Sequence, residues 1–283
     1  MGLGLDIKSC LLKYGHGLIK GTRIARLALV HRHQGQWQTL EQRAFGDGVY
    51  GAEPIYEDIA FDRGLTAHRP YTGDSSRPST GWHAQFADIN KDTWSDLYIA
   101  KGNVQAMPNF AAFDPDNLLL GTPSGQFEET GDAAGIAQDT RGRGAVIEDF
   151  NADGQLDLLV VNREAQPGLF RNLGPAGAST STQRLGNFLR VELDNGAVNP
   201  NAIGAMVSVK TGNRYQIQTV AIGGGHASGQ LGFVHFGLGL ADLAEVRVKW
   251  PDSGWSAPYQ VYANSHVVIS RDETNVLLWY PVD

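Results

Sequence analysis

Short apolar runs recur along the chain and are separated by Gly, Asn, Asp and Pro. Several of these runs alternate apolar and polar side chains, as at 188–193, 206–210 and 246–250. Alternation with a period of two marks half-buried strands, and Gly, Asn, Asp and Pro gather in the turns between strands. Long stretches with helical periodicity are hard to find. The pattern therefore predicts an all-β protein.

One acidic segment occurs twice, each time directly before an apolar run, and reads D-x-N-x-D-x-x-x-D over 88–96 and again over 149–157. Oxygen atoms at positions 1, 3, 5 and 9 of a tight loop can converge on one point, where carboxylates without a cation repel each other. Calcium takes roughly six to eight oxygen ligands, so we expect a calcium ion in each loop. The expected ligands are Asp88, Asn90, Asp92 and Asp96 in the first loop and Asp149, Asn151, Asp153 and Asp157 in the second.

The two loops differ at the sixth position, where the first has Thr93 and the second has Gly154. Glycine readily adopts the left-handed backbone that such turns use, so the second loop is expected to be the stronger calcium site. An EF-hand would need a Glu at the twelfth position and a helix on each side. Ile99 and Val160 stand at the twelfth positions and strands are expected at the flanks, so we exclude an EF-hand.

The acidic loops belong to a longer repeat. An aromatic-acidic run at 56–59 is followed by Gly64-Leu65, and a similar run at 127–130 is followed by Gly135-Ile136 at the same offset. Two hairpins with a polar turn are also expected, from 27–30 to Trp37 and from 117–120 to Phe127. Repeated units of several short strands suit the blades of a β-propeller, but a closed ring takes about four or more blades. The strand edges of an open arc attract other chains, so we expect a partner at those edges or a longer protein.

The residues also resemble two known families. The two loops resemble those of FG-GAP/VCBS repeats, the blades of integrin-α-like propellers, and this resemblance implies calcium in both. The segments at 201–209, 223–230, 234–239 and 246–254 resemble the ASPIC/UnbV domain. The combination resembles cartilage-acidic-protein-type chains, which are mostly exported, and so implies an extracellular or periplasmic location. No established chemistry of the ASPIC/UnbV domain carries over.

Three parts are expected along the chain. Blades of the FG-GAP/VCBS type cover 1–173, and 1–50 is read as a degenerate blade. The small, polar stretch at 174–182 is typical of a linker, which we place at 174–186. A small β-sandwich-like domain of the ASPIC/UnbV type covers 187–283. The expected fold class is therefore all-β, with an incomplete set of propeller-type blades followed by a sandwich.

Charge and composition narrow the function further. The formal net charge is −7, and without a basic patch nucleic acid is not an expected partner. No apolar run approaches the roughly 20 residues that span a bilayer. The single cysteine, Cys10, forms no internal disulfide and leaves the compartment open. The N-terminal stretch lacks a charged segment before an apolar one, so the protein is cytoplasmic, or its leader was removed or lies outside this sequence.

Catalytic motifs are weak. Neither acidic loop holds a histidine that could serve as the base of a metal hydrolase. His226 and Ser228 lie in a glycine-rich turn, but the chain has no G-x-S-x-G nucleophile elbow, and the glycine run lacks the Lys-Ser/Thr ending of a phosphate loop. His235 is expected to be a structural residue in a strand. We therefore expect a protein that is not an enzyme.

The sequence thus predicts a calcium-stabilised binding or assembly protein that acts on protein or cell-surface partners. Two alternatives stay open. The chain could be a subunit of a larger complex or filament whose neighbours complete the blades. It could also bind or cleave polysaccharides, because exposed aromatic side chains stack on sugars. The aromatic candidates for such a glycan site are Trp82, Trp94, Trp250, Trp255, Tyr259 and Tyr262.

Overall fold

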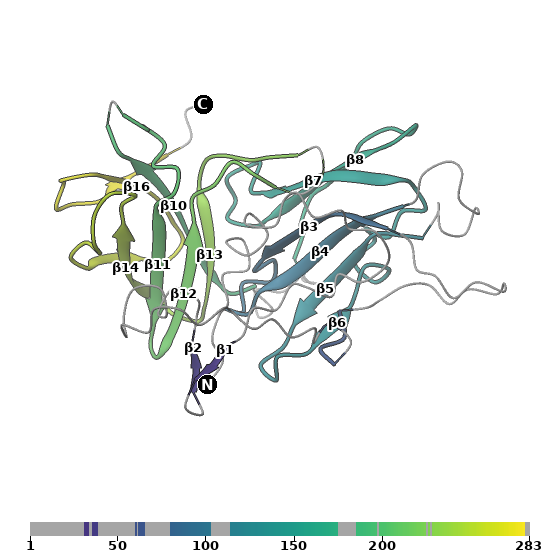
Figure 1. The fold of residues 1–283 in the computed structure, drawn as a ribbon, viewed down its shortest axis with the longest axis horizontal. Coiled ribbons are helices and arrows are strands. Elements are labelled where there is room, and N and C mark those ends of the chain that lie inside the picture. The colour runs from purple at the N-terminus through teal and green to yellow at the C-terminus, as the bar shows by residue number, and fades with distance from the viewer. Residues whose placement is uncertain are drawn as a thin grey trace.

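The computed structural model describes residues 60, 62–65, 80–102, 114–174, 185–196, 198–224, 226 and 228–280, together with the backbone of 31–33 and 36–38. These residues form strands and turns without a helix, and none of their sheets closes into a barrel (Figure 1). The predicted all-β fold is confirmed. The described residues hold no helix that could cross a membrane.

The first blade is an antiparallel meander of four strands in the order β3-β4-β5-β6. Its strands are β3 (Gly81–Ala87), β4 (Asp96–Lys101), β5 (Asn117–Gly121) and β6 (Phe127–Glu129). The first acidic loop joins β3 to β4. The expected hairpin between β5 and β6 is confirmed, and Gly125 takes a positive φ of 75° in its turn.

The second blade repeats this meander with the three strands β7 (Gly142–Glu148), β8 (Asp157–Asn162) and β9 (Gly168–Phe170). The second acidic loop joins β7 to β8, just as the first joins β3 to β4. Both β3 and β7 also carry an irregularity at their second residue. One detail differs from the sequence repeat: the strand at 127–129, which opens the second sequence unit, pairs with β5 and so completes the first blade.

The two blades pack face to face through the alternating side chains of β4. Leu97 and Ile99 point to one side, where they pack with Leu65. Tyr98 and Ala100 point to the other side and are buried against the second blade. Strand β4 is therefore buried on both faces, as the inner sheets of stacked blades are.

The C-terminal part is a sandwich of two four-stranded sheets, ordered β13-β10-β16-β17 and β12-β11-β14-β15. The apolar side chains of the facing strands form one core between the sheets, and the strands expected at 188–193, 206–210 and 246–250 are present. The strands are β10 (Asn187–Asp194), β11 (Met206–Thr211), β12 (Arg214–Thr219), β13 (Val234–Gly239), β14 (Leu243–Lys249), β15 (Tyr259–Tyr262), β16 (Ser265–Ser270) and β17 (Leu277–Leu278).

Strands β1 (His31–His33) and β2 (Gln36–Gln38) pair antiparallel at the place of the other expected hairpin. The rest of the expected degenerate blade at 1–50 and most of the expected linker at 174–186 lie outside the described residues.

Candidate functional site

The first acidic loop is a tight turn that its own carboxylates hold in place. Asp88 accepts hydrogen bonds from the backbone N–H of Asp92 at 3.0 Å and of Thr93 at 2.8 Å. Asp96, at the far end of the loop, accepts one from the N–H of Gly121 at 2.9 Å. The loop thus fixes the β3–β4 turn and ties it to the end of β5.

The second acidic loop repeats this geometry. Asp149 accepts hydrogen bonds from the N–H of Asp153 at 3.0 Å and of Gly154 at 2.8 Å. Asp157 accepts one from the N–H of Asn172, just after β9, at 2.8 Å. The eight predicted ligand residues therefore lie in two loops of the same structure, each at the end of its own blade.

The sixth position has a left-handed backbone in both loops. Gly154 has a φ of 82° and Thr93 a φ of 77°. The sequence-based preference for glycine at this position is therefore confirmed in its backbone geometry. A left-handed conformation costs a non-glycine residue about 1–2 kcal/mol, so the first loop holds its threonine under strain.

Two carboxyl groups of the first loop are buried, and their charged forms are disfavoured. Burial raises the pKa of Asp88 well above its usual range, and the nearby charges of Asp96 and Asp92 raise it further. Burial likewise raises the pKa of Asp96 to about 7. Carboxylates that disfavour each other's ionisation in this way are stabilised when a cation lies between them.

The loops fit calcium in chemistry and turn shape, but their ligands are not gathered. No three His, Cys, Asp or Glu side chains in the described part of the chain lie together at metal-binding spacing. Asn90 and Asp92 hydrogen-bond to each other instead, with 3.0 Å between Nδ2 and Oδ2. The donor set is all oxygen and the sixth residue is left-handed, as a calcium loop requires. A bound ion would have to draw these side chains together.

The first loop also contacts the sandwich, through its backbone. The N–H of Gly239 donates to the carbonyl oxygen of Lys91 at 3.0 Å. Arg214, at the start of β12, donates to the carbonyl oxygen of Thr93 at 2.6 Å, and its guanidinium carbon lies 3.6 Å from the ring centre of Trp94. One end of the sandwich is therefore seated on this loop.

The second loop contacts the sandwich mainly through side chains. Arg190 of β10 donates to Asp149 at 3.2 Å and to Glu148 at 2.6 Å. His235 of β13 lies with its Nε2 atom 3.2 Å from the carbonyl oxygen of Gly154. Sequence reasoning missed these contacts. The one visible signal was Glu148, which replaces the alanine found before the first loop.

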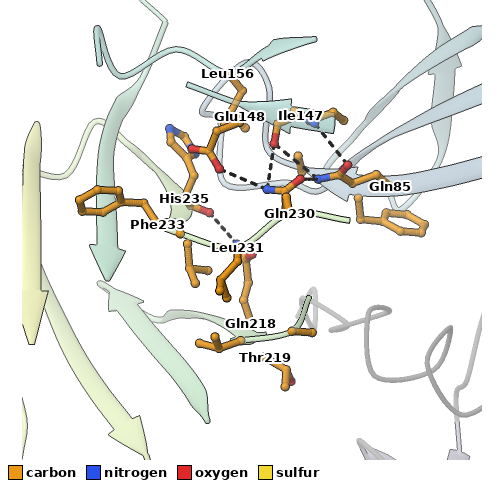
Figure 2. Close-up of a pocket in the computed structure, with 16 residues that line it drawn as sticks. Gln85, Ile147, Glu148, Leu156, Gln218, Thr219, Gln230, Leu231, Phe233 and His235 are labelled. Carbon is orange, nitrogen blue, oxygen red and sulfur yellow. Dashed lines mark hydrogen bonds between the residues drawn. The ribbon is translucent and has the colours of Figure 1, made fainter. Parts of the chain in front are cut away.

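A small cavity of about 40 Å³ lies between the blades and the sandwich (Figure 2). Its wall is a hydrogen-bonded row in which Gln85 donates to Gln230 at 2.8 Å and Gln230 donates to Glu148 at 3.2 Å. A cavity of this volume is large enough for a water molecule, whereas small-molecule sites measure roughly 300 Å³ or more.

Two ionisable side chains in this cavity have shifted pKa values, and burial is the main cause of both shifts. Burial raises the pKa of Glu148 and lowers the pKa of His235 to about 3. Glu148 is ion-paired with Arg190 and His235 contacts a carbonyl oxygen of the second loop. Both side chains thus contribute to the contact between the domains.

The structure pairs Ser228 with His83 of β3, at 2.7 Å between Oγ and Nδ1. The other ring nitrogen of His83 lies 3.2 Å from the amide oxygen of Gln85. His226, the sequence neighbour of Ser228, packs instead on Trp82, with 4.9 Å between ring centres. The glycine-rich turn is therefore a third contact between the sandwich and the blades.

Several of the aromatic candidates for sugar stacking are engaged inside the protein. The guanidinium carbon of Arg143 lies 4.4 Å from the ring centre of Trp82, and Arg214 covers Trp94. Trp250 is buried in the sandwich core. Trp255 and Tyr262 are exposed.

Comparison with known proteins gives one family match and two relatives. Residues 195–276, which lie within the C-terminal sandwich, match the family model described as "ASPIC and UnbV". The mouse protein "Cartilage acidic protein 1" is 34% identical over 162 residues, which cover 55% of this chain and 22% of that protein. The human protein of the same name is 33% identical over 130 residues, or 44% and 18%. The chain spans about a fifth of the length of these relatives.

Proposed function

We propose that the chain is a calcium-stabilised, non-catalytic binding protein that assembles with other proteins through an uncovered face of its second blade. The location we propose is outside the cell or in the periplasm, from the resemblance to exported chains. The observation that carries the assembly proposal is the difference between two equivalent sheet faces.

Tyr98 and Ala100 of the first blade are fully buried under the second blade. Counted from the end of each acidic loop, the equivalent residues of the second blade are Leu159 and Val161. Val161 is 49% exposed, and Leu169, which lies opposite Leu159 on β9, is 68% exposed. In the described part of the chain, the second blade thus exposes an apolar face, whereas the equivalent face of the first blade is covered by its neighbour.

The element that packs on the apolar face of the first blade indicates what kind of partner would pack on the same face of the second blade. Strand β7 of the second blade belongs to an antiparallel sheet, and its apolar side chains Ala145 and Ile147 share one cluster with Tyr98 and Ala100. The partner we propose for the second blade is therefore another sheet of the blade type, supplied by a second copy of this chain. Contiguous exposed apolar surface of this kind marks interaction sites. A larger complex or filament would use the same face.

Calcium would stabilise the blades from the loops. The FG-GAP/VCBS resemblance, the repeated hydrogen bonding and the buried carboxylates of the first loop support this part of the proposal. The ligands would be Asp88, Asn90, Asp92 and Asp96, with their counterparts in the second loop. A bound ion neutralises the loop charge and holds the two flanking strands in register. The small cavity and the domain-contact roles of its ionisable residues support a non-catalytic role.

Light scattering during size exclusion, over a range of protein concentrations, tests the assembly. The mass of the wild-type chain is expected to rise with concentration. The double variant V161S/L169S is expected to weaken self-association by about tenfold or more, because each buried aliphatic side chain contributes about 1.5–3 kcal/mol. L240S is the matched control, since Leu240 is 94% exposed in the sandwich. A monomer mass that stays constant at all concentrations contradicts assembly through this face.

A further inference from the structure

Among the described residues, arginines form ion pairs with the carboxylates of one acidic loop and not with those of the other. In the second loop, Asp149 pairs with Arg190 and Asp153 pairs with Arg171, each at 3.2 Å. The carboxylates of the first loop form no ion pair with any of the described residues. The two loops therefore have the same backbone and different electrostatic surroundings.

Arg190 is fixed in place on strand β10. Its side chain is 6% exposed and binds Glu148 at 2.6 Å in addition to Asp149. The guanidinium carbon lies 4.6 Å from the ring centre of Phe233, and one nitrogen lies 3.1 Å from Nδ1 of His266. A buried charge that loses its partners is strongly destabilising, so this arginine and its carboxylates form one unit.

The sandwich contacts the first loop through a backbone carbonyl oxygen and not through a carboxylate. Arg214 is attracted by Asp88 and Asp92, but its hydrogen bond goes to the carbonyl oxygen of Thr93. Glu148, the second partner of Arg190, has Ala87 as its counterpart before the first loop. Lys91 is attracted most by Asp153 and Asp149 of the second loop and less by Asp88 of the first, so its charge also favours the second loop.

We propose that Arg190 is a built-in counter-ion of the second loop. Its ion pairs with Asp149 and Glu148 hold the sandwich against the second blade, a contact termed the latch. The same ion pairs leave the first loop as the tighter calcium site. The proposal rests on the proposed calcium binding. A divalent ion at Asp149 would lie beside a fixed guanidinium and be repelled by it, whereas the first loop keeps its carboxylates for the ion. This order is the reverse of the one that glycine at the sixth position predicts.

Calcium titration of the full metal-free chain, followed by calorimetry and native mass spectrometry, tests the order of the sites. The wild-type chain is expected to bind one ion tightly and a second weakly, and D96N is expected to remove the tight site. R190Q is expected to tighten the weak site by about tenfold or more and to leave the other unchanged. R163Q is the matched control, because Arg163 pairs with the neighbouring Glu164.

Two further variants separate charge from general damage. E148Q removes a negative charge beside the second loop and is expected to weaken the second site, which is the opposite of the R190Q effect. Loss of packing would weaken calcium binding in both variants. R190K keeps the charge and is expected to behave like the wild type, which gives a reading if R190Q fails to fold.

Hydrogen exchange in EGTA tests the latch without calcium. In R190Q the N–H of Gly154 is expected to exchange about tenfold faster or more, while that of Thr93 in the first loop stays unchanged. If neither loop takes calcium, the calcium proposal fails and the latch stands or falls on this exchange alone. Two equal sites in the wild type overturn the proposed order. Unchanged affinities and exchange in R190Q overturn the latch.

Discussion

Gly154 is subject to two separate constraints. Its φ is +82°, and a Cβ added there would lie 2.0 Å from a ring atom of Phe188. Phe188 belongs to β10, so the glycine is required by the turn and also by the seating of the sandwich. Thr93 meets only the first constraint, which explains why a side chain is tolerated in the first loop.

G154A is therefore expected to destabilise the chain by about 3 kcal/mol or more, since backbone strain of about 1–2 kcal/mol adds to the clash. G196A is the control, because Gly196 has a φ of +76° and nothing within 4 Å of an added Cβ. It is expected to cost the strain alone. Urea unfolding of both variants measures the difference, and equal losses would show that Phe188 contributes nothing to it.

Rules that act within a few residues predicted the loops well. The left-handed sixth position and the hairpin near Gly125 both follow from local chemistry, and the structure has both of them. The contact of Ser228 with His83 joins residues 145 positions apart. No local pattern marks such a pair, so sequence reasoning placed Ser228 beside His226 and missed its partner.

Each acidic loop closes a hairpin, because it joins two paired strands of its blade. The loop carboxylates accept backbone N–H groups from within the turn and from the next strand or the segment after it. The sequence unit that begins at 127 does not coincide with the second blade, since β6 pairs with β5 and closes the first blade. Strand order depends on which edges meet, and the acidic spacing carries no information about that.

Calcium removal is expected to loosen both hairpins. Calcium at about 100 times its dissociation constant adds about 2.7 kcal/mol per site, which corresponds to roughly 5–10 °C in a chain of this size. Differential scanning fluorimetry with calcium and with excess EGTA measures the shift, and magnesium in place of calcium is the control. An identical melting temperature in all three conditions contradicts a structural calcium ion.

At the scale of the whole molecule, the sandwich is held by three separate contacts with the blades. Arg214 binds the first loop, Arg190 binds the second, and Ser228 binds β3. The alternating strands of the sandwich were predictable because each strand carries its own pattern. The orientation of the sandwich was not predictable, because its contacts are made by polar residues that lie far apart in the sequence and that no local pattern marks.

Three contacts spread over both blades should make the described domains unfold together. For the wild type we expect the calorimetric and van't Hoff enthalpies to agree, as they do in a two-state transition. R214M removes the hydrogen bond to Thr93 and a cation–π contact worth up to about 2 kcal/mol. The calorimetric enthalpy should then exceed the van't Hoff value, because the first blade separates from the sandwich before either melts.

R247M is the control, since Arg247 pairs with Glu245 on its own strand. If R214M and R247M give the same scan, the Arg214 contact does not couple the domains, and the remaining two contacts carry the cooperativity.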